Sequence, residues 1–333
     1  MKLKSKAPKE AMVKYRQAPC SGNDINGLGE TEFRRSNYIY HSNGKSGPLP
    51  FDSMQHVFRY SVPAKMLPRI IDGAWATFRP QGALSDKKLE VSDPEKMTQK
   101  IKEKALELGA GVVGICELKE EYLVEGAVNK FRYAIVLGLP MDREKMLTVP
   151  GHTAAMEVQR VYTQGSYLTV DLTRYIRSLG WPTKALPINS ASEYLHIPMA
   201  IAAGVGELGK HGSLICKEYG SNFRLTSVIT DLPLVPDKPV DIGVEDICAT
   251  CQACIKGCPP DAIFSQKQWV RGTKKWYVDF DKCVPYFSST YGCGICLQVC
   301  PWSEPGRGPT LSEKLLRLRD KKTDKQSTGP SED

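Results

Sequence analysis

The distribution of cysteines constrains the fold of this chain more than any other feature. Eight of the eleven cysteines lie between positions 248 and 300 of a chain of 333 residues. A disulfide scaffold would scatter its cysteines through a small secreted chain, whereas tight clustering in a larger chain indicates metal binding. Of the remaining three, Cys116 and Cys216 lie in apolar runs and are expected to be buried, unreactive thiols; the third is Cys20.

The spacing of these cysteines predicts two iron–sulfur clusters. One group fits C-x2-C-x2-C-x3-C followed by proline, the run of two-cluster bacterial ferredoxins, in which the fourth cysteine binds the other cluster. The other group fits C-x2-C-x3-C followed by proline, with its remaining cysteine displaced upstream. We therefore expect cluster one on Cys248, Cys251, Cys254 and Cys300, and cluster two on Cys258, Cys283, Cys293 and Cys296. Two structural zinc sites are the alternative, but zinc favours separated C-x2-C pairs.

The segment between Cys283 and Cys293 departs from a plain ferredoxin. Its nine residues, VPYFSSTYG, carry Tyr286, Phe287 and Tyr291. These aromatic side chains either lean against a cofactor near cluster two or pack on their own domain. We take Tyr286 and Phe287 as candidate cofactor contacts.

Composition and charge narrow the choice of partners. The net charge is +8 and the pI is near 8.8, and both ends of the chain are basic. We expect these ends to be solvated, and we expect no nucleic-acid binding, because no basic run is interleaved with aromatic residues in a recognisable module. No apolar run reaches 18 residues and no export signal is recognisable, so a cytoplasmic location is expected. If an export signal was trimmed, the protein would be membrane-associated.

Strand-like and helix-like segments alternate upstream of the cysteines, which predicts an α/β fold. A helix begins after Asp93, a capping residue followed by proline, and a second long helix spans 153–179. Strands are expected in GVVGICEL, FRYAIVLGLP, PTKALPI and FRLTSVITDLPL, and a short helix in IPMAIAAGVG. We divide the chain into an irregular arm over 1–92, an α/β domain over 93–243, a ferredoxin-like module over 244–302 and a polar tail over 303–333. The aromatic stretch 51–78 of the arm either caps a pocket or packs on the core, and the tail is expected to hold a helix remnant and disordered chain.

The α/β domain is expected to hold an electron acceptor. A bare ferredoxin needs only about 60 residues, and roughly 240 residues precede these cysteines. No G-x-G-x-x-G follows a strand, no P-loop is present, and no D-x-H-x-x-G offers a histidine to cobalt. Short motifs therefore leave the acceptor unnamed.

Longer segments resemble the catalytic subunit of the corrinoid-dependent reductive dehalogenases. The resemblance lies in AGVGELGKHGSLICKEYGSNFRLTSVITDLPL followed by the double cysteine module, and in DPEKMTQKIKEKALELGAGVVGICEL and VLGLPMD. It covers residues from about 93 to 302. The family implies a nitroreductase-like α/β (α+β) core that binds cobalamin base-off, without a protein ligand to cobalt, and two [4Fe-4S] clusters that deliver electrons to it. The implied reaction is removal of halide from a small halogenated organic substrate by Co(I) cobalamin. The implied partners are a ferredoxin or flavodoxin as electron donor and, if the chain is exported, a membrane anchor protein.

The resemblance also implies an acid and a basic neighbour. Removing a halide consumes two electrons and one proton, and tyrosine beside a cation suits the role of proton donor. The family places this tyrosine about sixty residues before an arginine or lysine, and Arg224 matches the basic residue. Tyr162 lies 62 residues before Arg224 and Tyr167 lies 57 residues before it, so Tyr162 is the first choice and Tyr167 the competitor. Asn189 aligns with a polar pocket residue that orients substrate. The structural alternatives are a packing role for Tyr162 and an ion pair for Arg224.

The glycine-rich segment supplies candidate corrinoid contacts. Its glycines would let the backbone approach the ring closely, although turns explain them too. Lys210 and His211 are expected to touch corrinoid side chains rather than substrate, and Ser213 to bond the nucleotide tail. The full set of candidate cofactor contacts is Gly204, Gly206, Gly209, Lys210, His211, Gly212, Ser213, Tyr286 and Phe287.

Two other functions stay open at this point. An epoxyqueuosine reductase-like enzyme shares the corrinoid and the clusters but acts on a tRNA nucleoside, uses a carboxylate acid and often carries helical repeats after the clusters. No such repeat follows Pro301. An electron-transfer protein would hold the clusters without cobalt, and the poor match of the first 90 residues to the dehalogenase family is compatible with it.

Overall fold

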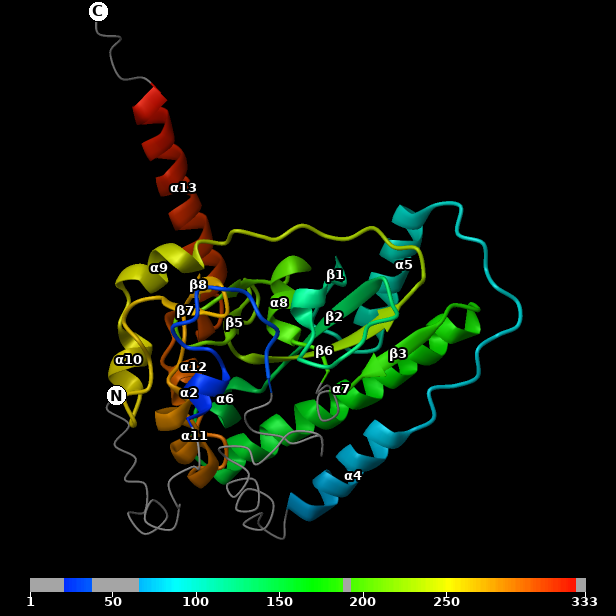
Figure 1. The fold of residues 1–333 in the computed structure, drawn as a ribbon, viewed down its shortest axis with the longest axis horizontal. Helices are drawn as coiled ribbons and strands as arrows, with labels where there is room; N and C mark the ends of the chain where they lie inside the picture. Colours follow the sequence, from blue (N-terminus) through cyan, green and yellow to red (C-terminus); the bar gives the residue numbers. More distant parts are fainter. Residues whose placement is uncertain (1–20, 38–65, 188–192, 328–333) are drawn as a thin grey trace, which may run out of the picture.

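The structure, a computed structural model, describes residues 21–37, 66–187 and 193–327, with side chains up to residue 321. Its centre is a four-stranded sheet in the order β1-β2-β6-β3, in which every neighbouring pair is antiparallel (Figure 1). The strands are β1 (Val112–Glu117), β2 (Tyr133–Pro140), β6 (Phe223–Thr230) and β3 (Thr183–Leu186). The mixed helix and strand content confirms the predicted fold class, and the antiparallel pairing makes this core α+β.

The predicted elements of the α/β domain form where the sequence placed them. The helices are α2 (Gly22–Ile25), α4 (Leu67–Phe78), α5 (Pro94–Glu107), α6 (Arg143–Met146), α7 (His152–Ser178), α8 (His196–Ala202), α9 (Val244–Thr250), α10 (Ala253–Gly257), α11 (Phe280–Ser289), α12 (Ile295–Gln298) and α13 (Arg307–Ser327). The remaining elements are the 3-10 turns η2 (Glu120–Tyr122) and η3 (Pro301–Ser303), the ribbon of β4 (Glu207–Leu208) with β5 (Leu214–Ile215), and the ribbon of β7 (Gln268–Val270) with β8 (Thr273–Lys275). Asp93 caps α5 as expected, because its side chain accepts a hydrogen bond from the backbone N–H of Lys96 at 3.0 Å.

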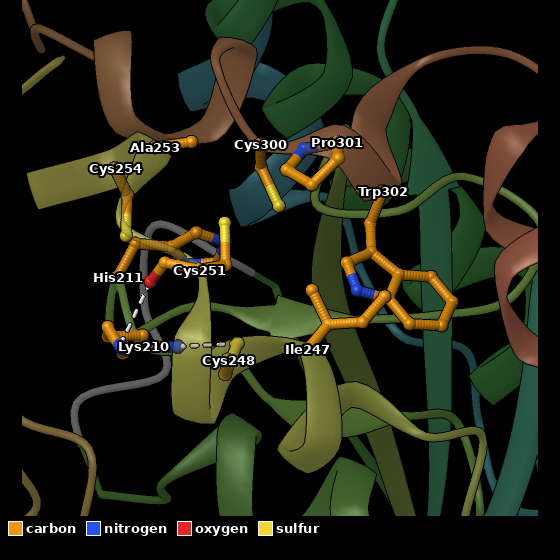
Figure 2. Close-up of a pocket in the computed structure, with 10 residues that line it drawn as sticks. All are labelled: Lys210, His211, Ile247, Cys248, Cys251, Ala253, Cys254, Cys300, Pro301 and Trp302. Carbon is orange, nitrogen blue, oxygen red and sulfur yellow. Dashed lines mark hydrogen bonds between the residues drawn. The ribbon is translucent and has the colours of Figure 1, made fainter. Parts of the chain in front are cut away.

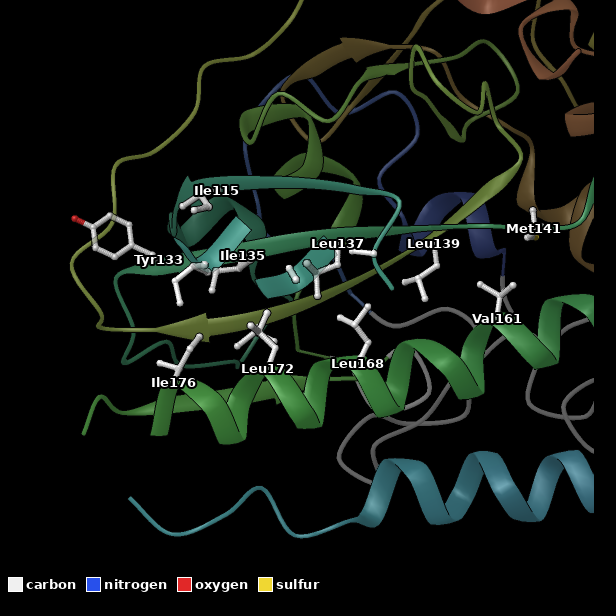
Figure 3. Close-up of a cluster of buried hydrophobic side chains, with 14 of the residues drawn as sticks. Ile115, Tyr133, Ile135, Leu137, Leu139, Met141, Val161, Leu168, Leu172 and Ile176 are labelled. Carbon is white, nitrogen blue, oxygen red and sulfur yellow. The ribbon is translucent and has the colours of Figure 1, made fainter. Parts of the chain in front are cut away.

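The long helix α7 covers one face of the sheet. Its apolar residues recur at helical spacing, so Leu168, Leu172 and Ile176 lie on one side and are each at most 2% exposed. They pack against the buried strand β2, whose Ile135 and Leu137 belong to the same core (Figure 3). Burying each such side chain stabilises the fold by about 1.5–3 kcal/mol. This packing holds α7 in a fixed position relative to β2 and β6.

The short helix α8 covers the opposite face. Gly114 allows the C-terminal end of α8 to approach β1 closely, because a Cβ at this position would lie 2.2 Å from the carbonyl oxygen of Ala203. Cys116 and Cys216 lie in this second core and are buried, as predicted. Burial raises the pKa of both thiols to about 12, since a thiolate would lose its hydration there.

The cysteine module lies beside one end of the sheet and contains α9 to α12 and the β7–β8 ribbon (Figure 1). An extended segment, 231–243, carries the chain from β6 across to α9. A third core joins the module to the α/β domain, with Ile215 beside Trp276 and Trp302. The module is therefore packed on the domain rather than tethered to it.

A short segment near the N-terminus, which contains α2, is hydrogen-bonded to the cysteine module. Asn23, on α2, donates a hydrogen bond to Asp279 at 2.8 Å and accepts one from the backbone N–H of Phe280 at 2.9 Å, partners 256 and 257 positions away. Asp279 is also the N-cap of α11. This segment thus fixes the first turn of the helix that carries Cys283.

The tail and part of the arm are more ordered than the sequence suggested. The tail contains the helix that we expected, α13, which is 21 residues long and packs Leu311 and Leu315 against the third core. Within the arm, α4 packs along α7 and leaves Trp75 and Phe78 69% and 84% exposed. No helix in the described ranges is long and apolar enough to span a membrane.

Three parts of the predictions fall outside the described residues. They concern Cys20, Asn189 and the aromatic residues of the arm before position 66. The domain boundaries at 92, 243 and 302 stay predictions.

Candidate functional site

Four of the predicted ligands surround one cavity (Figure 2). Cys248, Cys251 and Cys254 reach it from α9, from its C-cap and from α10, and Cys300 reaches it from the N-cap of η3. The other residues that line it are Lys210, His211, Ile247, Ala253, Pro301 and Trp302. The fourth thiol comes from the second cysteine group, as the two-cluster run predicts.

The cavity suits a metal cluster because its four thiols lie together and three of them, all except the partly exposed Cys251, are buried. Burial raises the pKa of the Cys254 thiol to about 11 and that of Cys300 to about 12, since a thiolate would lose its hydration. A metal centre removes the protons of such thiols when it binds. The backbone N–H of Lys210 donates to Cys248 Sγ at 3.4 Å, a hydrogen bond that supports negative charge on the sulfur. This donor set fits a [4Fe-4S] cluster.

The other four cysteines form a second group. The pKa of Cys283 is raised to about 12. Burial is the main cause, and the neighbouring thiols of Cys293 and Cys258 add to it. Burial is also the main cause that raises the pKa of Cys296, and Cys293, Cys283, Cys258 and, from the first group, Cys254 add to it. Cys258 Sγ also accepts the backbone N–H of Ala262 at 3.4 Å. Within the described ranges no three His, Cys, Asp or Glu side chains are arranged to hold a single metal ion, so the grouping rests on burial and mutual influence.

The predicted acid and its basic neighbour face each other between α7 and β6. The guanidinium carbon of Arg224 lies 5.8 Å from the centre of the Tyr162 ring. The neighbouring Val161 is fully buried in the core, which fixes this turn of α7. Arg224 Nε is buried and has no hydrogen-bond partner among the described residues. A buried donor without a partner is costly, so this guanidinium is suited to meet a group that the described chain does not supply.

Tyr167 has different partners. Its hydroxyl donates to Asp72 of α4 at 2.7 Å, and this bond raises the pKa of the phenol above its usual value. The guanidinium carbon of Arg79 lies 4.9 Å from the Tyr167 ring centre. Five residues correspond to about 1.4 helical turns, so Tyr162 and Tyr167 leave α7 on different sides. The structure brings Tyr162, not Tyr167, to Arg224, and the role of Tyr162 as acid stays a prediction.

Lys210 and His211 both face the cluster-one cavity (Figure 2). The Nζ atom of Lys210 donates to the carbonyl oxygen of Cys251 at 2.9 Å. His211 Nδ1 accepts the backbone N–H of Ser213 at 3.1 Å, so Nε2 carries the proton and donates to Ser221 Oγ at 2.8 Å. Burial lowers the pKa of His211 to about 4, which keeps the ring neutral. Contact of Lys210, His211 or Ser213 with a corrinoid stays a prediction.

The glycines of the same segment are explained by packing within the chain. At each of them an added Cβ would come closer than 3.0 Å to a protein atom: Lys238 O for Gly204, Ile215 O for Gly206, His211 for Gly209 and Val278 for Gly212. Gly204 and Gly212 also have positive φ angles of 69° and 76°. Their approach to a corrinoid ring stays a prediction.

The aromatic residues between the cysteines lie on and after α11. Tyr286 is buried, and its carbonyl oxygen accepts a hydrogen bond from the Thr290 hydroxyl at 2.6 Å. Phe287 is 36% exposed. Tyr291 adopts a positive φ of 54° and contacts the ring of His152, with 4.1 Å between the ring centroids. The role of Tyr286 and Phe287 as cofactor contacts stays a prediction.

Two residues that the sequence analysis missed lie at the boundary between the core and the module. Like Arg224 Nε, the atoms His152 Nε2 and Gln298 Oε1 are buried and have no hydrogen-bond partner among the described residues. His152 opens α7, and Gln298 of α12 donates to Asn222 at 3.1 Å, just before Arg224. Buried polar atoms without a partner are suited to meet a polar group that the described chain does not supply. No short motif marks either residue.

Comparison with known proteins identifies the iron–sulfur domain and proteins that are similar to this chain. Residues 247–303 match the family described as a 4Fe-4S dicluster domain, which confirms the iron–sulfur prediction over the zinc alternative. A tetrachloroethene reductive dehalogenase of Sulfurospirillum multivorans is 29% identical over 263 residues, covering 65% of this chain and 52% of the relative. The chain is a homologue of the reductive dehalogenases. The solved catabolic reductive dehalogenase NpRdhA, in complex with 3-bromo-4-hydroxybenzoic acid, aligns with a TM-score of 0.68 at 27% identity, covering 77% of this chain and 39% of that one.

The extent of these matches differs between families. The chain spans about half the length of the Sulfurospirillum dehalogenase, 52%. An epoxyqueuosine reductase of Cyclobacterium marinum is 35% identical over 121 residues, 31% of this chain and 35% of the relative. The dehalogenase match therefore covers about twice as much of this chain, 65% against 31%.

Proposed function

We propose that this chain is a reductive dehalogenase, an oxidoreductase that replaces the halogen of a small organic molecule by hydrogen. The observation that carries the proposal is the pairing of Tyr162 with Arg224, at 5.8 Å, on a core homologous to reductive dehalogenases. In the net reaction the substrate takes up two electrons and one proton and releases a halide ion. A 4Fe-4S domain in the same chain is the expected source of the electrons.

The cofactors of this proposal are two [4Fe-4S] clusters and a base-off corrinoid. The two groups of cysteines would hold the clusters, and the boundary with unpartnered His152, Gln298 and Arg224 atoms would receive the corrinoid. When bound, these groups supply single electrons and a strongly reducing cobalt centre. A ferredoxin or flavodoxin is the proposed electron donor.

The chain itself supplies the proton. Tyr162 is the proposed acid, and its hydroxyl proton goes to the carbon that loses the halide. Arg224 stabilises the phenolate that is left, because a cation nearby lowers the energy of an anion in a partly buried site. The buried Val161 and the packing of α7 on β2 hold the ring in place while this happens. Solvent then returns a proton to Tyr162.

The proposal is tested by metal content and turnover. Protein purified without oxygen from cells supplied with cobalamin should contain about eight irons and one cobalt per chain. It should release halide from halogenated phenols or alkenes in the presence of a strong reductant. Tyr162→Phe should slow this release strongly, to a low residual rate, and Tyr167→Phe, which removes only the bond to Asp72, should keep it. About eight irons with no cobalt would favour an electron-transfer protein instead.

An epoxyqueuosine reductase-like activity is the second candidate. It is favoured by the 35% identity to the Cyclobacterium relative over 121 residues. That family uses a carboxylate acid, whereas the group that faces Arg224 here is the Tyr162 ring. Incubation with epoxyqueuosine-containing tRNA separates the two: formation of queuosine, with no halide release from any organohalide, would replace the first proposal.

A further inference from the structure

Lys210 is a buried cation for which the described part of the chain supplies no acidic partner. The residue is 2% exposed and lines the cluster-one cavity. Its Nζ donates to the carbonyl oxygen of Cys251 at 2.9 Å and lies 4.7 Å from the centre of the Trp276 ring. Among the described residues no carboxylate forms an ion pair with it. Burying an ammonium group is costly unless an opposite charge lies nearby, so a counter-charge is needed at this position.

Glu245, the acidic residue that shares Trp276 with Lys210, is already engaged. Glu245 accepts a hydrogen bond from the Trp276 indole N–H at 3.1 Å and forms an ion pair with Lys267 at 2.8 Å. Lys267 lies on the same Trp276 ring, at 5.5 Å from its centre, but it is not among the residues that line the cavity. Lys210 therefore faces the thiols, while Lys267 is neutralised by Glu245.

The rest of the cavity lining carries no competing charge. His211 accepts a backbone N–H at Nδ1 and donates from Nε2, so in this arrangement the ring has no place for a second proton. The other residues that line it are cysteines and apolar side chains. Lys210 also touches the ligands at both of its ends, because its backbone N–H donates to Cys248 Sγ at 3.4 Å.

We infer that Lys210 is the fixed counter-charge of cluster one and raises its reduction potential. Four cysteine thiolates give a [4Fe-4S] cluster a net negative charge, and the one electron that it accepts adds another. A cation held in a buried site favours the more negative state. Lys210 is thus a positioning residue for electron transfer that acts through the cluster. The inference rests on the iron–sulfur part of the proposed function and does not depend on dehalogenation.

The test is a redox titration of the reconstituted full chain, followed by electron paramagnetic resonance. The variants are Lys210→Met, which removes the charge, Lys210→Gln, which keeps a hydrogen-bond donor, and Lys210→Arg, which keeps the charge. Cys251→Ser identifies the signal of cluster one. At a fixed potential, Lys210→Met and Lys210→Gln should lower the ratio of reduced to oxidised cluster one about tenfold, which is about 59 mV for one electron. Lys210→Arg and the control Glu245→Gln/Lys267→Met, which removes a neutral ion pair, should leave this ratio near that of the wild type.

Each outcome decides the inference. Lys210→Met or Lys210→Gln protein that keeps its iron and the wild-type potential would overturn it. If both neutral variants lose cluster one and only Lys210→Arg retains it, the requirement for charge is supported; if Lys210→Arg loses it as well, the side chain acts through shape and the inference is wrong. Wild-type protein that binds no clusters would overturn the iron–sulfur part of the proposed function too, which distinguishes the two failures.

Discussion

Replacing Arg224 by methionine is expected to slow dehalogenation about 100-fold. The guanidinium carbon lies 5.8 Å from the Tyr162 ring centre, over which much of the charge of a phenolate is spread. At this separation Coulomb's law gives about 3 kcal/mol for an effective dielectric constant of about 20. Since about 1.4 kcal/mol is a tenfold change in rate, removal of the cation costs about two powers of ten. In a site as polar as bulk water the loss would shrink to about threefold.

The assay measures halide release from a brominated phenol by protein that a chemical reductant keeps reduced, so that no natural donor is needed. Iron and cobalt contents of each variant must match those of the wild type before rates are compared. Arg224→Lys keeps a cation and should stay within about tenfold of the wild-type rate. The double variant Tyr162→Phe/Arg224→Met should be no slower than Tyr162→Phe alone, because no phenolate is then left to stabilise.

Two results would refute this reasoning. One is a fully loaded Arg224→Met protein that turns over at the wild-type rate. The other is a double variant that is slower than Tyr162→Phe by the same factor that Arg224→Met shows alone. In the second case Arg224 contributes to the reaction independently of Tyr162, for example by binding the substrate.

Three further predictions follow from the burial of single side chains. Cys283→Ser, which removes one thiol of the second group, should lower the iron content from about eight to about four per chain, whereas Cys116→Ser, outside both groups, should leave it unchanged. Leu172→Ala, at a fully buried position between α7 and β2, should lower the free energy of unfolding by about 2–5 kcal/mol in denaturant titrations, while Val128→Ala, 75% exposed, should change it little. Burial lowers the pKa of His196 from 6.5 to about 4, so the folded state keeps the ring neutral while the unfolded chain takes up a proton below pH 6.5. Its contribution is complete above pH 6.5 and is lost as the pH falls toward 4, so stability should drop by about 2 kcal/mol more between pH 7.5 and 5.0 in the wild type than in His196→Gln; equal drops would contradict the assignment.

The cysteine grouping and the main helices were predictable because local rules govern them. In ferredoxins with this run, a cysteine from the second group completes the first cluster. The structure brings Cys300 to the cavity that Cys248, Cys251 and Cys254 line. The helix α5 followed from its cap and proline, and α7 from its apolar stripe. The meeting of Tyr162 and Arg224 was expected from the family resemblance alone, since no periodicity links two residues on different elements.

Features that depend on long-range packing were not predictable. Alternating strands and helices are compatible with parallel or antiparallel sheets, and only the pairing of β2 with both β1 and β6 settles which forms. Tyr167, the other candidate for the acid, forms a hydrogen bond with Asp72, which lies 95 positions away on another helix. The hydrogen bond from Lys210 to the carbonyl oxygen of Cys251, 41 positions downstream, was not predicted either. The sequence around Tyr167 and Lys210 does not indicate either of these partners.

The bond between Asn23 and Asp279 spans 256 positions, and this has a consequence for how the protein is made. The ribosome synthesises the N-terminal segment first and the cysteine module near the end. During most of synthesis the segment therefore has no Asp279 or Phe280 to bind. Until then the first turn of α11, which carries Cys283, lacks the side chain that covers it. The contacts that fix the first turn of α11 can therefore form only after most of the chain has been synthesised.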